Sequence, residues 1–385
     1  MIHSIYKNTM KVLHIGKYYA PIEGGIESIN RFVVEALKKY PQRVLSFNNK
    51  NNSCEEDIDG VSIVRASSTG ILASQPISIK YFWELRRYIH LFDPDVIHFH
   101  YPNPLGALYL NLLIGYKRKL IVHWHSDIVA QKNLYRLIKP IEKKILEKAT
   151  VIIATSPDYK KYSYALRNFQ EKITTIPCSI DENKLELKSG DEEKIKNLKM
   201  KYDNKPILLF VGRHVEYKGI RYLLESEKYV KNDCVFLIGG KGPLTDELMN
   251  QFSSPRIHWL GRISDEELRI YYHAASIFTF PSITKNEAFG VVLAEAMYCS
   301  TPTITFTIEG SGVNWVSINE QTGLEVENKN TQEYAKAIDR LLMDHEFSNS
   351  LGQQAKERVK QLFTKEAVST KYQSLYESFD TTHKD

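Results

Sequence analysis

The chain has 385 residues, of which 43% are hydrophobic and 25% are charged, as is usual for a soluble globular protein with enough material for about two domains. No apolar run approaches the roughly 18 residues of a membrane-spanning helix, and the first residues lack the apolar core of a signal peptide. The four cysteines show neither CxxC nor metal-ligand spacing, so we expect a cytoplasmic protein with reduced thiols.

The charge is distributed unevenly along the chain. Residues 1–190 carry a net charge of +9 and residues 191–385 one of −4, which together give the overall +5. This asymmetry predicts that the two halves contact different partners, although a pattern that serves only solubility would look the same.

Short β-branched runs alternate with amphipathic segments in the first half of the chain. After an N-terminal extension (residues 1–9), strands are predicted at 11–16, 43–47, 61–66, 95–100, 120–125, 151–156 and 173–178, and helices at 26–40, 79–90 and 133–148. The alternation favours a parallel, doubly wound α/β sheet in a Rossmann-like first domain, residues 10–185.

The same alternation restarts after a polar, charged segment at 186–204, which we expect to link two domains. Strands are predicted at 207–212, 234–240, 256–261, 275–282, 301–306 and 323–327, and helices at 220–230 and 288–299. This predicts a second Rossmann-like domain over 205–362, followed by a C-terminal helix and tail (363–385), and we expect this helix to cross back to the first domain. Ligands of such sheets bind beyond the carboxyl ends of the strands, so we expect two facing domains with a cleft between them.

Gly24 and Gly25 follow the first predicted strand and precede a helix. Two glycines allow the backbone to approach a ligand closely, and a helix N-terminus favours an anion. The stretch is not the GxGxxG fingerprint of dinucleotide-binding domains. It indicates either a phosphate-binding loop or a flexible turn.

His123 and His125 stand at the end of a predicted strand, in the stretch VHWHSD. We expect the two side chains to point to opposite faces, with His123 hydrogen-bonded in the core and His125 facing the cleft or the neighbouring helices. A zinc site would need more ligands, and none occurs nearby at ligand spacing.

Arg213 and Lys218 follow the first strand of the second domain, just before a helix. A guanidinium offers a planar fork of donors and an ammonium a point charge, and a helix N-terminus adds to the attraction for anions. The pair predicts a diphosphate site, the alternative being two solvated loop cations. The glycine-rich loop at 239–243 is expected to line the same cleft.

Glu287 and Glu295 flank the start of a predicted helix in NEAFGVVLAE. Carboxylates accept hydrogen bonds from sugar hydroxyls, and the amides of Phe289, Gly290 and Val291 are expected to be free at the helix start. The stretch therefore predicts a site for a phosphorylated sugar. An acidic first turn that complements the helix dipole would explain Glu287 but not Glu295.

Together these motifs resemble the retaining nucleotide-sugar glycosyltransferases of family 4, which have the GT-B fold. The resemblance covers most of residues 10–365, and four ordered motifs are more specific than any one of them. The matches are E-x7-E at Glu287 and Glu295, GR-x4-KG at Gly212-Arg213 and Lys218-Gly219, the glycine loop at Gly24-Gly25, and the strand-end histidine at His125.

The resemblance implies a transferase that needs neither a metal nor another cofactor, because side-chain cations neutralise the donor diphosphate. The implied catalytic residues are Glu287, His125, Arg213 and Lys218. The implied donor-binding residues are Gly24 and Gly25 at the phosphates, Arg213 and Lys218 at the diphosphate, Glu287, Phe289 and Gly290 at the sugar, and Glu295 at the ribose. Val291 is also an implied donor-binding residue.

The mechanism implied by the resemblance is front-face substitution through an oxocarbenium-like ion pair, in which stabilisation of the leaving phosphate dominates. A glycosyl-enzyme intermediate would need a carboxylate nucleophile, and no obvious one is present. The chain departs from the family pattern at TFTIEGSGVNW. There the placement of Glu309 differs, so no role is carried over to it.

The resemblance is greatest to mannosyl- and rhamnosyl-transferring members of bacterial O-antigen and polysaccharide assembly, which favours GDP-mannose as donor. Residues 128–172 hold ten basic and four acidic residues, and their mixed apolar and basic helix suits an anionic inner leaflet. We expect a lipid-linked or oligosaccharide acceptor and a peripheral contact with the inner face of the cytoplasmic membrane, the alternative being a solvated helix. Nucleic acid is not an expected partner, because no binding motif occurs.

Two alternative functions stay open. One is a glycosyltransferase of the same fold that uses a UDP-sugar donor, such as a GlcNAc, glucose or galactose transferase. The other is a GT-B protein that does not transfer sugar, such as a nucleotide-sugar 2-epimerase or a nucleotide-sugar-binding subunit. The spacing of Arg213, Lys218 and the two glutamates speaks against an epimerase, and Glu287 and His125 speak against a non-catalytic subunit.

Overall fold

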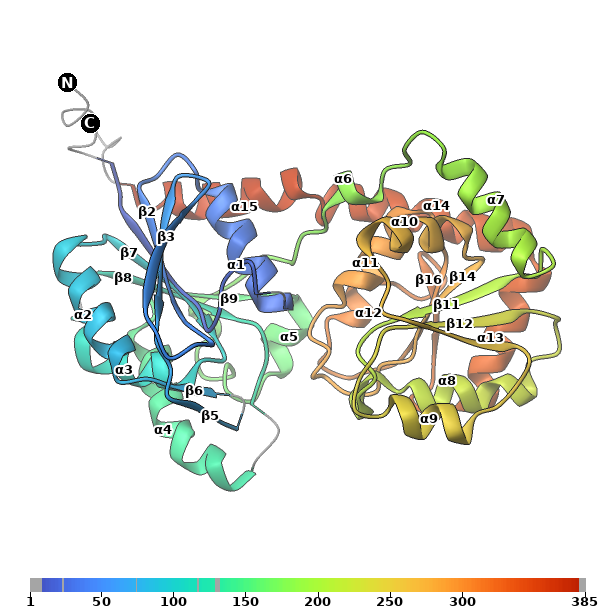
Figure 1. Ribbon diagram of the computed structural model, residues 1–385, viewed down its shortest axis with the longest axis horizontal. Coiled ribbons are helices and arrows are strands. Elements are labelled where there is room, and N and C mark those ends of the chain that lie inside the picture. The colour runs from blue at the N-terminus through green and yellow to red at the C-terminus, as the bar shows by residue number, and fades with distance from the viewer. Residues whose placement is uncertain (1–8, 23, 74, 116–117, 129–131, 381–385) are drawn as a thin grey trace. The chain divides into compact units, whose positions relative to one another are not determined.

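The computed structural model describes residues 9–22, 24–73, 75–115, 118–128 and 132–380 (Figure 1). The chain forms two units, each a largely parallel sheet with helices on both faces. The first unit comprises Met1–Thr155, Lys160–Ile176 and Ser369–Asp385, and the second comprises Ser156–Tyr159 and Pro177–Val368. All but the last residue of the predicted N-terminal extension, 1–9, lie outside the described residues. No helix of the described part has both the length and the apolar character needed to cross a bilayer.

The first unit contains an eight-stranded sheet in which only β3 runs antiparallel to its neighbour. The strands, in sheet order, are β10 (Ile173–Thr175), β9 (Val151–Ala154), β8 (Lys119–Trp124), β7 (Val96–Tyr101), β1 (Val12–Ile15), β2 (Gln42–Phe47), β4 (Val61–Ala66) and β3 (Cys54–Ile58), with a separate hairpin of β5 (Gly70–Leu72) and β6 (Gln75–Ile77). The helices are α1 (Gly25–Ala36), α2 (Lys80–Leu91), α3 (Pro104–Leu113), α4 (Lys132–Lys148), α5 (Pro157–Tyr162), which extends from the second unit into the first, and the end of α15 (Lys365–Glu377).

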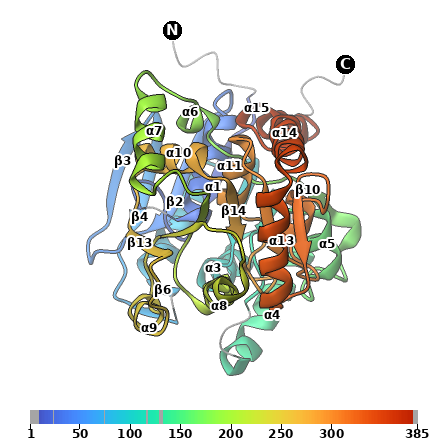
Figure 2. The same cartoon turned by 90° about the vertical axis from the view of Figure 1, so that its right-hand side faces the viewer.

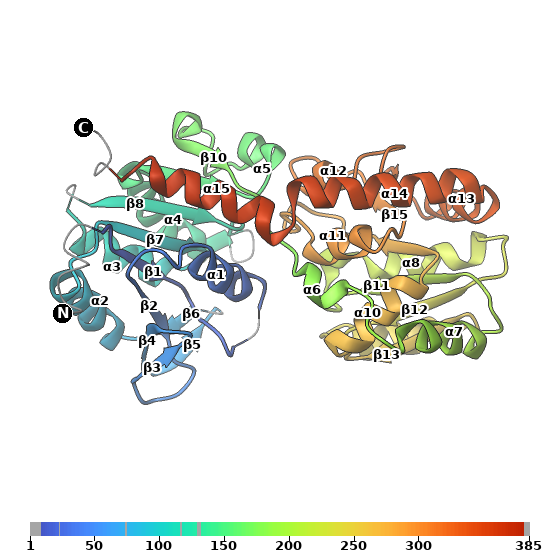
Figure 3. The ribbon, with the colours of Figure 1, turned by 90° about the horizontal axis from the view of Figure 1, so that it is seen from above.

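The central strands of this sheet are covered on both faces. Every residue of β1 and β7 is buried, as expected for inner strands of a parallel sheet. Helices α2, α3 and α4 pack in sequence on one face, and α15 crosses the other face beside α1 (Figure 3). The predicted return of the C-terminal helix to the first domain is confirmed, because α15 belongs to the first unit from Ser369 onward.

The second unit contains a six-stranded, fully parallel sheet. Its strands, in sheet order, are β13 (Ile257–Gly261), β12 (Val235–Gly239), β11 (Ile207–Val211), β14 (Ile277–Phe280), β15 (Thr303–Phe306) and β16 (Gly323–Val326). Its helices are α6 (Glu182–Leu185), α7 (Asp191–Lys201), α8 (Ile220–Ser226), α9 (Thr245–Gln251), α10 (Asp265–Ala274), α11 (Val291–Tyr298), α12 (Val313–Val316), α13 (Thr331–Met343) and α14 (His345–Leu362). Helices α8 and α9 cover one face, and α10 and α11 cover the other (Figure 2).

The prediction of an interdomain linker at 186–204 is wrong, because this segment contains α7 of the second unit. Most side chains of α7 are exposed, so its composition resembles that of a linker. The helix is held by Asp191, whose carboxylate forms a buried ion pair with Arg269 of α10 at 2.7 Å.

We expect the Asp191→Ala variant to lose about 3 kcal/mol of unfolding free energy, because Arg269 would stay buried without a counter-charge. The hydrogen bond from Arg269 lowers the pKa of Asp191 to about 2. A carboxylate whose pKa is lowered by folding stabilises the native state above its unfolded pKa, and that stabilisation is lost as the pH falls through about 4 towards 2. Urea unfolding of wild type and variant near pH 7 and near pH 3 measures both effects. A loss no larger than that of Glu192→Ala, which removes an exposed neighbour, would contradict this role.

Candidate active site

Two residues that the sequence placed in separate motifs meet in the second unit. Lys218 is the last residue of a short 3-10 helix, Glu216–Lys218, that follows β11, and Glu287 lies in the loop between β14 and α11. Their side chains form an ion pair between Lys218 Nζ and Glu287 Oε2, and both residues are only 9% exposed. The Ser282 hydroxyl donates to the same carboxylate oxygen at 3.2 Å. Because β11 and β14 are parallel neighbours, their carboxyl ends bring together residues 69 positions apart.

The glycine after Lys218 makes this approach possible. Gly219 has a φ of 63°, and a Cβ atom added there would lie 2.0 Å from the carbonyl oxygen of Pro281. Any other residue would push the loop away from the end of β14. A backbone hydrogen bond also joins the two segments, because the amide of Ile283 donates to the carbonyl of Tyr217 at 2.9 Å.

The helix that follows Glu287 begins at Val291, later than predicted, with Gly290 as its N-cap at a φ of 87°. Glu287 is therefore outside the first turn, and a helix-dipole role no longer accounts for it. Among the described residues, none accepts a backbone hydrogen bond from the amides of Phe289, Gly290 or Val291. Their assignment to a bound ligand stays a prediction.

Glu295 lies in the second turn of α11, where the Tyr272 hydroxyl donates to its Oε2 at 2.9 Å. Burial raises the pKa of the Glu295 carboxyl group. Neither Tyr272 nor Ser282 was predicted as a site residue. Ser282 is the last residue of the predicted strand at 275–282, which was a usable signal, whereas Tyr272 lies in the last turn of α10 without any motif.

The other predicted phosphate-binding elements of the second unit lie at loops after strands. Arg213 is two residues beyond β11 and is exposed, in contrast to the buried Lys218. The glycine-rich loop after β12 lines a cavity of about 480 Å³, whose walls include Lys241, Thr245 and Trp259. This loop is therefore part of a concave surface that has room for part of a nucleotide.

In the first unit, Gly24 is the N-cap of α1 and Gly25 its first residue, so the predicted glycine-to-helix transition is confirmed. A Cβ atom added to Gly25 would meet nothing within 4 Å, whereas one on Gly24 would lie 2.1 Å from Oε2 of Glu27. The Glu27 carboxylate thus lies at the N-terminus of α1. A phosphate bound there would have to displace it.

The expectation that the side chains of His123 and His125 point to opposite faces of the sheet is wrong. His123 and His125 lie on the same face with ring centroids 4.1 Å apart, because residues two apart on a strand share a face. Burial lowers the pKa of His125 to about 3. The expectation that no further ligand-type residue lies nearby is also wrong: Nδ1 of His100 on β7 is 2.9 Å from Nε2 of His125. The parallel pairing of β7 with β8 brings them together.

Comparisons with known proteins agree with this arrangement. The family model "Glycosyltransferase Family 4" matches residues 24–184, and "Glycosyl transferases group 1" matches residues 191–358. D-rhamnosyltransferase WbpZ of Pseudomonas aeruginosa is 30% identical over 362 residues, 92% of each chain. O-antigen chain mannosyltransferase C of Escherichia coli is 27% identical over 374 residues, 95% of this chain and 98% of the relative.

Solved structures show the same architecture. Sucrose-phosphate synthase of Thermosynechococcus elongatus has a TM-score of 0.79 at 24% identity and covers 96% of this chain and 99% of its own. WaaG, a glycosyltransferase of lipopolysaccharide biosynthesis, has a TM-score of 0.68 at 13% identity and covers 94% and 99%. The fold is thus that of the GT-B glycosyltransferases. The chain belongs to glycosyltransferase family 4, whose second-domain model is glycosyl transferases group 1, and it is a glycosyltransferase.

Proposed function

We propose that this enzyme transfers a hexosyl unit, with mannose from GDP-mannose as the best candidate, to a lipid-linked or oligosaccharide acceptor of O-antigen or other cell-surface polysaccharide. Transfer would retain the anomeric configuration and would need no metal at the donor site. The observation that carries the proposal is the buried pair of Lys218 and Glu287 beside free backbone amides. The relatives described as mannosyl- and rhamnosyltransferases support the donor assignment.

The Lys218–Glu287 pair supplies both kinds of contact that a sugar diphosphate needs. On donor binding, Lys218 would exchange its carboxylate partner for diphosphate oxygens, assisted by the exposed Arg213. Glu287 would then accept sugar hydroxyls, and the amides at 289–291 would donate to the donor. Glu295 would hold the ribose, and Gly24 and Gly25 would allow close approach to the phosphates.

The same contacts favour a front-face mechanism. In the proposed donor complex Glu287 would accept hydrogen bonds from the sugar hydroxyls and from Ser282, so it would not serve as the nucleophile of a glycosyl-enzyme intermediate. A cation held in a buried setting stabilises the charge that develops on the leaving diphosphate. His125, kept neutral by burial, would contribute a hydrogen bond to the donor.

The proposed peripheral contact with the inner leaflet involves α4. Lys139, Lys143 and Lys144 are exposed on this helix, and Leu137 is 70% exposed, whereas Ile145 is buried against the first unit. A face of this kind is attracted to anionic lipid by about 1 kcal/mol per basic residue. Lipid-linked acceptors would be presented at that surface.

Thermal unfolding with a panel of nucleotides, in the absence of metal, tests the donor assignment. A ligand at one hundred times its Kd stabilises the native state by about 2.7 kcal/mol. We expect GDP and GDP-mannose to raise the Tm and UDP compounds to leave it unchanged. Stabilisation by UDP compounds alone would replace GDP-mannose with the alternative UDP-sugar donor. No stabilisation by any nucleotide would overturn the donor site itself.

A further inference from the structure

Five buried histidines share one face of the first unit's sheet. They are His14 on β1, His98 and His100 on β7, and His123 and His125 on and just after β8, each at most 6% exposed. The proposed function uses only His125. A buried imidazole costs free energy unless both ring nitrogens have partners, so four further histidines at this place need an explanation.

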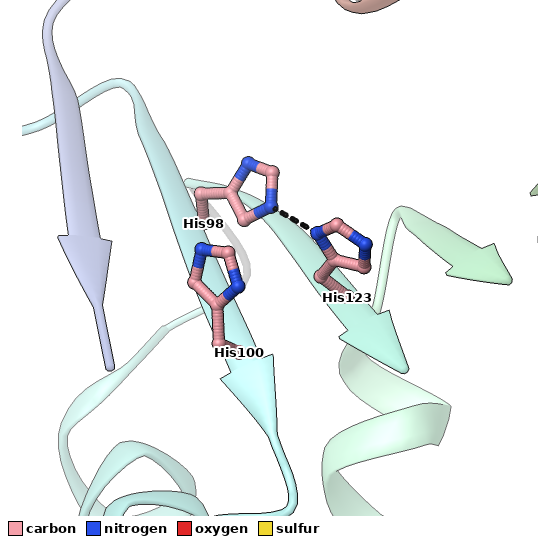
Figure 4. Close-up of side chains that lie close together, drawn as sticks. All are labelled: His98, His100 and His123. Atoms are coloured by element: carbon pink, nitrogen blue, oxygen red, sulfur yellow. Dashed lines mark hydrogen bonds between the residues drawn. The ribbon is translucent and has the colours of Figure 1, made fainter. Parts of the chain in front are cut away.

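Three of these rings converge from two adjacent strands (Figure 4). His98, His100 and His123 each offer one ring nitrogen, and the three nitrogens lie within 4.8 Å of one another. The closest pair, His98 Nε2 and His123 Nδ1, is 3.2 Å apart. Two nitrogens bound to one tetrahedral zinc ion at 2.0–2.1 Å lie about 3.3 Å apart. This pair already has the spacing of two ligands of one ion, and the ligand nitrogen of His100 lies within 4.8 Å of both.

The third ring has an unused nitrogen. Nε2 of His100 is buried and has no hydrogen-bond partner among the described residues. Its other nitrogen, Nδ1, faces Nε2 of His125 at 2.9 Å. If His100 carries its proton on Nδ1 and donates a hydrogen bond to His125, its Nε2 is unprotonated. The lone pair of Nε2 then has no hydrogen-bond partner among the described residues. Such a lone pair is the donor that d-block cations take from imidazole.

The surroundings orient the rings as in a metal site. The hydroxyl of Tyr376 on α15 lies 2.7 Å from Nδ1 of His98, so Nδ1 can carry the proton and leave Nε2 as the ligand atom. The ring of Tyr372, also on α15, lies 6.3 Å from His98 and 6.1 Å from His123 between ring centroids. Metal-binding histidines usually have their second nitrogen fixed by such a hydrogen bond.

We propose that His98, His100 and His123 bind one divalent d-block cation, with zinc as the ion that best matches three neutral imidazoles. The fourth position would be taken by water or another small ligand. These three residues belong to the first unit, whereas Lys218 and Glu287 of the proposed donor site belong to the second. The site is thus additional to the proposed function. By fixing the proton of His100 on Nδ1, the ion would also fix the tautomer of His125.

The test uses the full-length protein without an affinity tag and without nucleotide. The protein is incubated with Zn²⁺ or Co²⁺ alone and desalted, the retained metal is counted by mass spectrometry, and the visible spectrum of the Co²⁺ form is recorded. We expect one retained equivalent and the visible bands of four-coordinate Co²⁺. His100→Asn and His123→Asn should bind Co²⁺ about tenfold more weakly or worse.

The matched control is His14→Asn. His14 is a buried histidine of the same face, but its Nε2 bonds to Gln42 at 2.7 Å and it is not one of the three converging residues. It should retain one equivalent. Failure of the wild type to retain an ion, a six-coordinate Co²⁺ spectrum, or equal loss in His14→Asn would each overturn the proposal. The wild-type result decides the question even where a variant does not fold.

Discussion

Replacing Glu287 with glutamine is expected to slow sugar transfer by about two to three orders of magnitude, the range seen when one preorganised polar contact to a reacting group is removed. Affinity for the nucleoside diphosphate should change little, because the proposed contacts of Glu287 are with the sugar. Glutamine is chosen because its carbonyl still accepts from Lys218, whereas alanine would leave that buried ammonium without a partner.

The donor is the nucleotide sugar that raises the Tm in the thermal-unfolding panel, and the acceptor is an envelope glycolipid extract. The transfer rate is measured as the nucleoside diphosphate released, and the affinity for the nucleoside diphosphate is measured by calorimetry. The control is Glu346→Gln, which removes an exposed carboxylate from the first turn of α14. It should transfer at the wild-type rate. If Glu287→Gln also transfers at that rate, Glu287 does not hold the sugar.

Lys218→Ala is also expected to have a large effect, in this case on the affinity for the nucleoside diphosphate. Affinity for the nucleoside diphosphate should fall by about two orders of magnitude, because removal of one partner from a buried charge pair costs about 2–5 kcal/mol and leaves Glu287 as an uncompensated negative charge. Transfer should fall at least as much. Affinity for the nucleoside without phosphates should be unchanged, since Lys218 acts on the diphosphate.

The double variant Lys218→Ala/Glu287→Gln separates the two causes. Removal of the uncompensated carboxylate should restore part of the diphosphate affinity but none of the transfer. Lys228→Ala, which removes an exposed lysine of the second unit, should behave as wild type. A Lys218→Ala variant that folds and binds the diphosphate as tightly as wild type would remove Lys218 from the donor site.

Most of the strands were predictable because burial on both faces gives continuous apolar runs. The predicted strand at 61–66 coincides with β4, and the six predicted strands of the second half all occur. The strand β3 was missed because its residues, CEEDI, are nearly all exposed at a sheet edge. The segment containing α7 was missed because one buried ion pair, rather than an apolar face, attaches it.

The amino-acid sequence by itself determined most of the strands, the helices α1, α2, α4, α8 and α11, the two-sheet architecture, and through its motifs the glycosyltransferase family. Only the tertiary structure decided that Lys218 forms an ion pair with Glu287, that Tyr272 holds Glu295, and that histidines of β7 and β8 converge. Periodicity and motif spacing are local properties of the chain. Contacts between parallel strands depend on crossover connections and register, which join residues tens of positions apart and leave no local pattern.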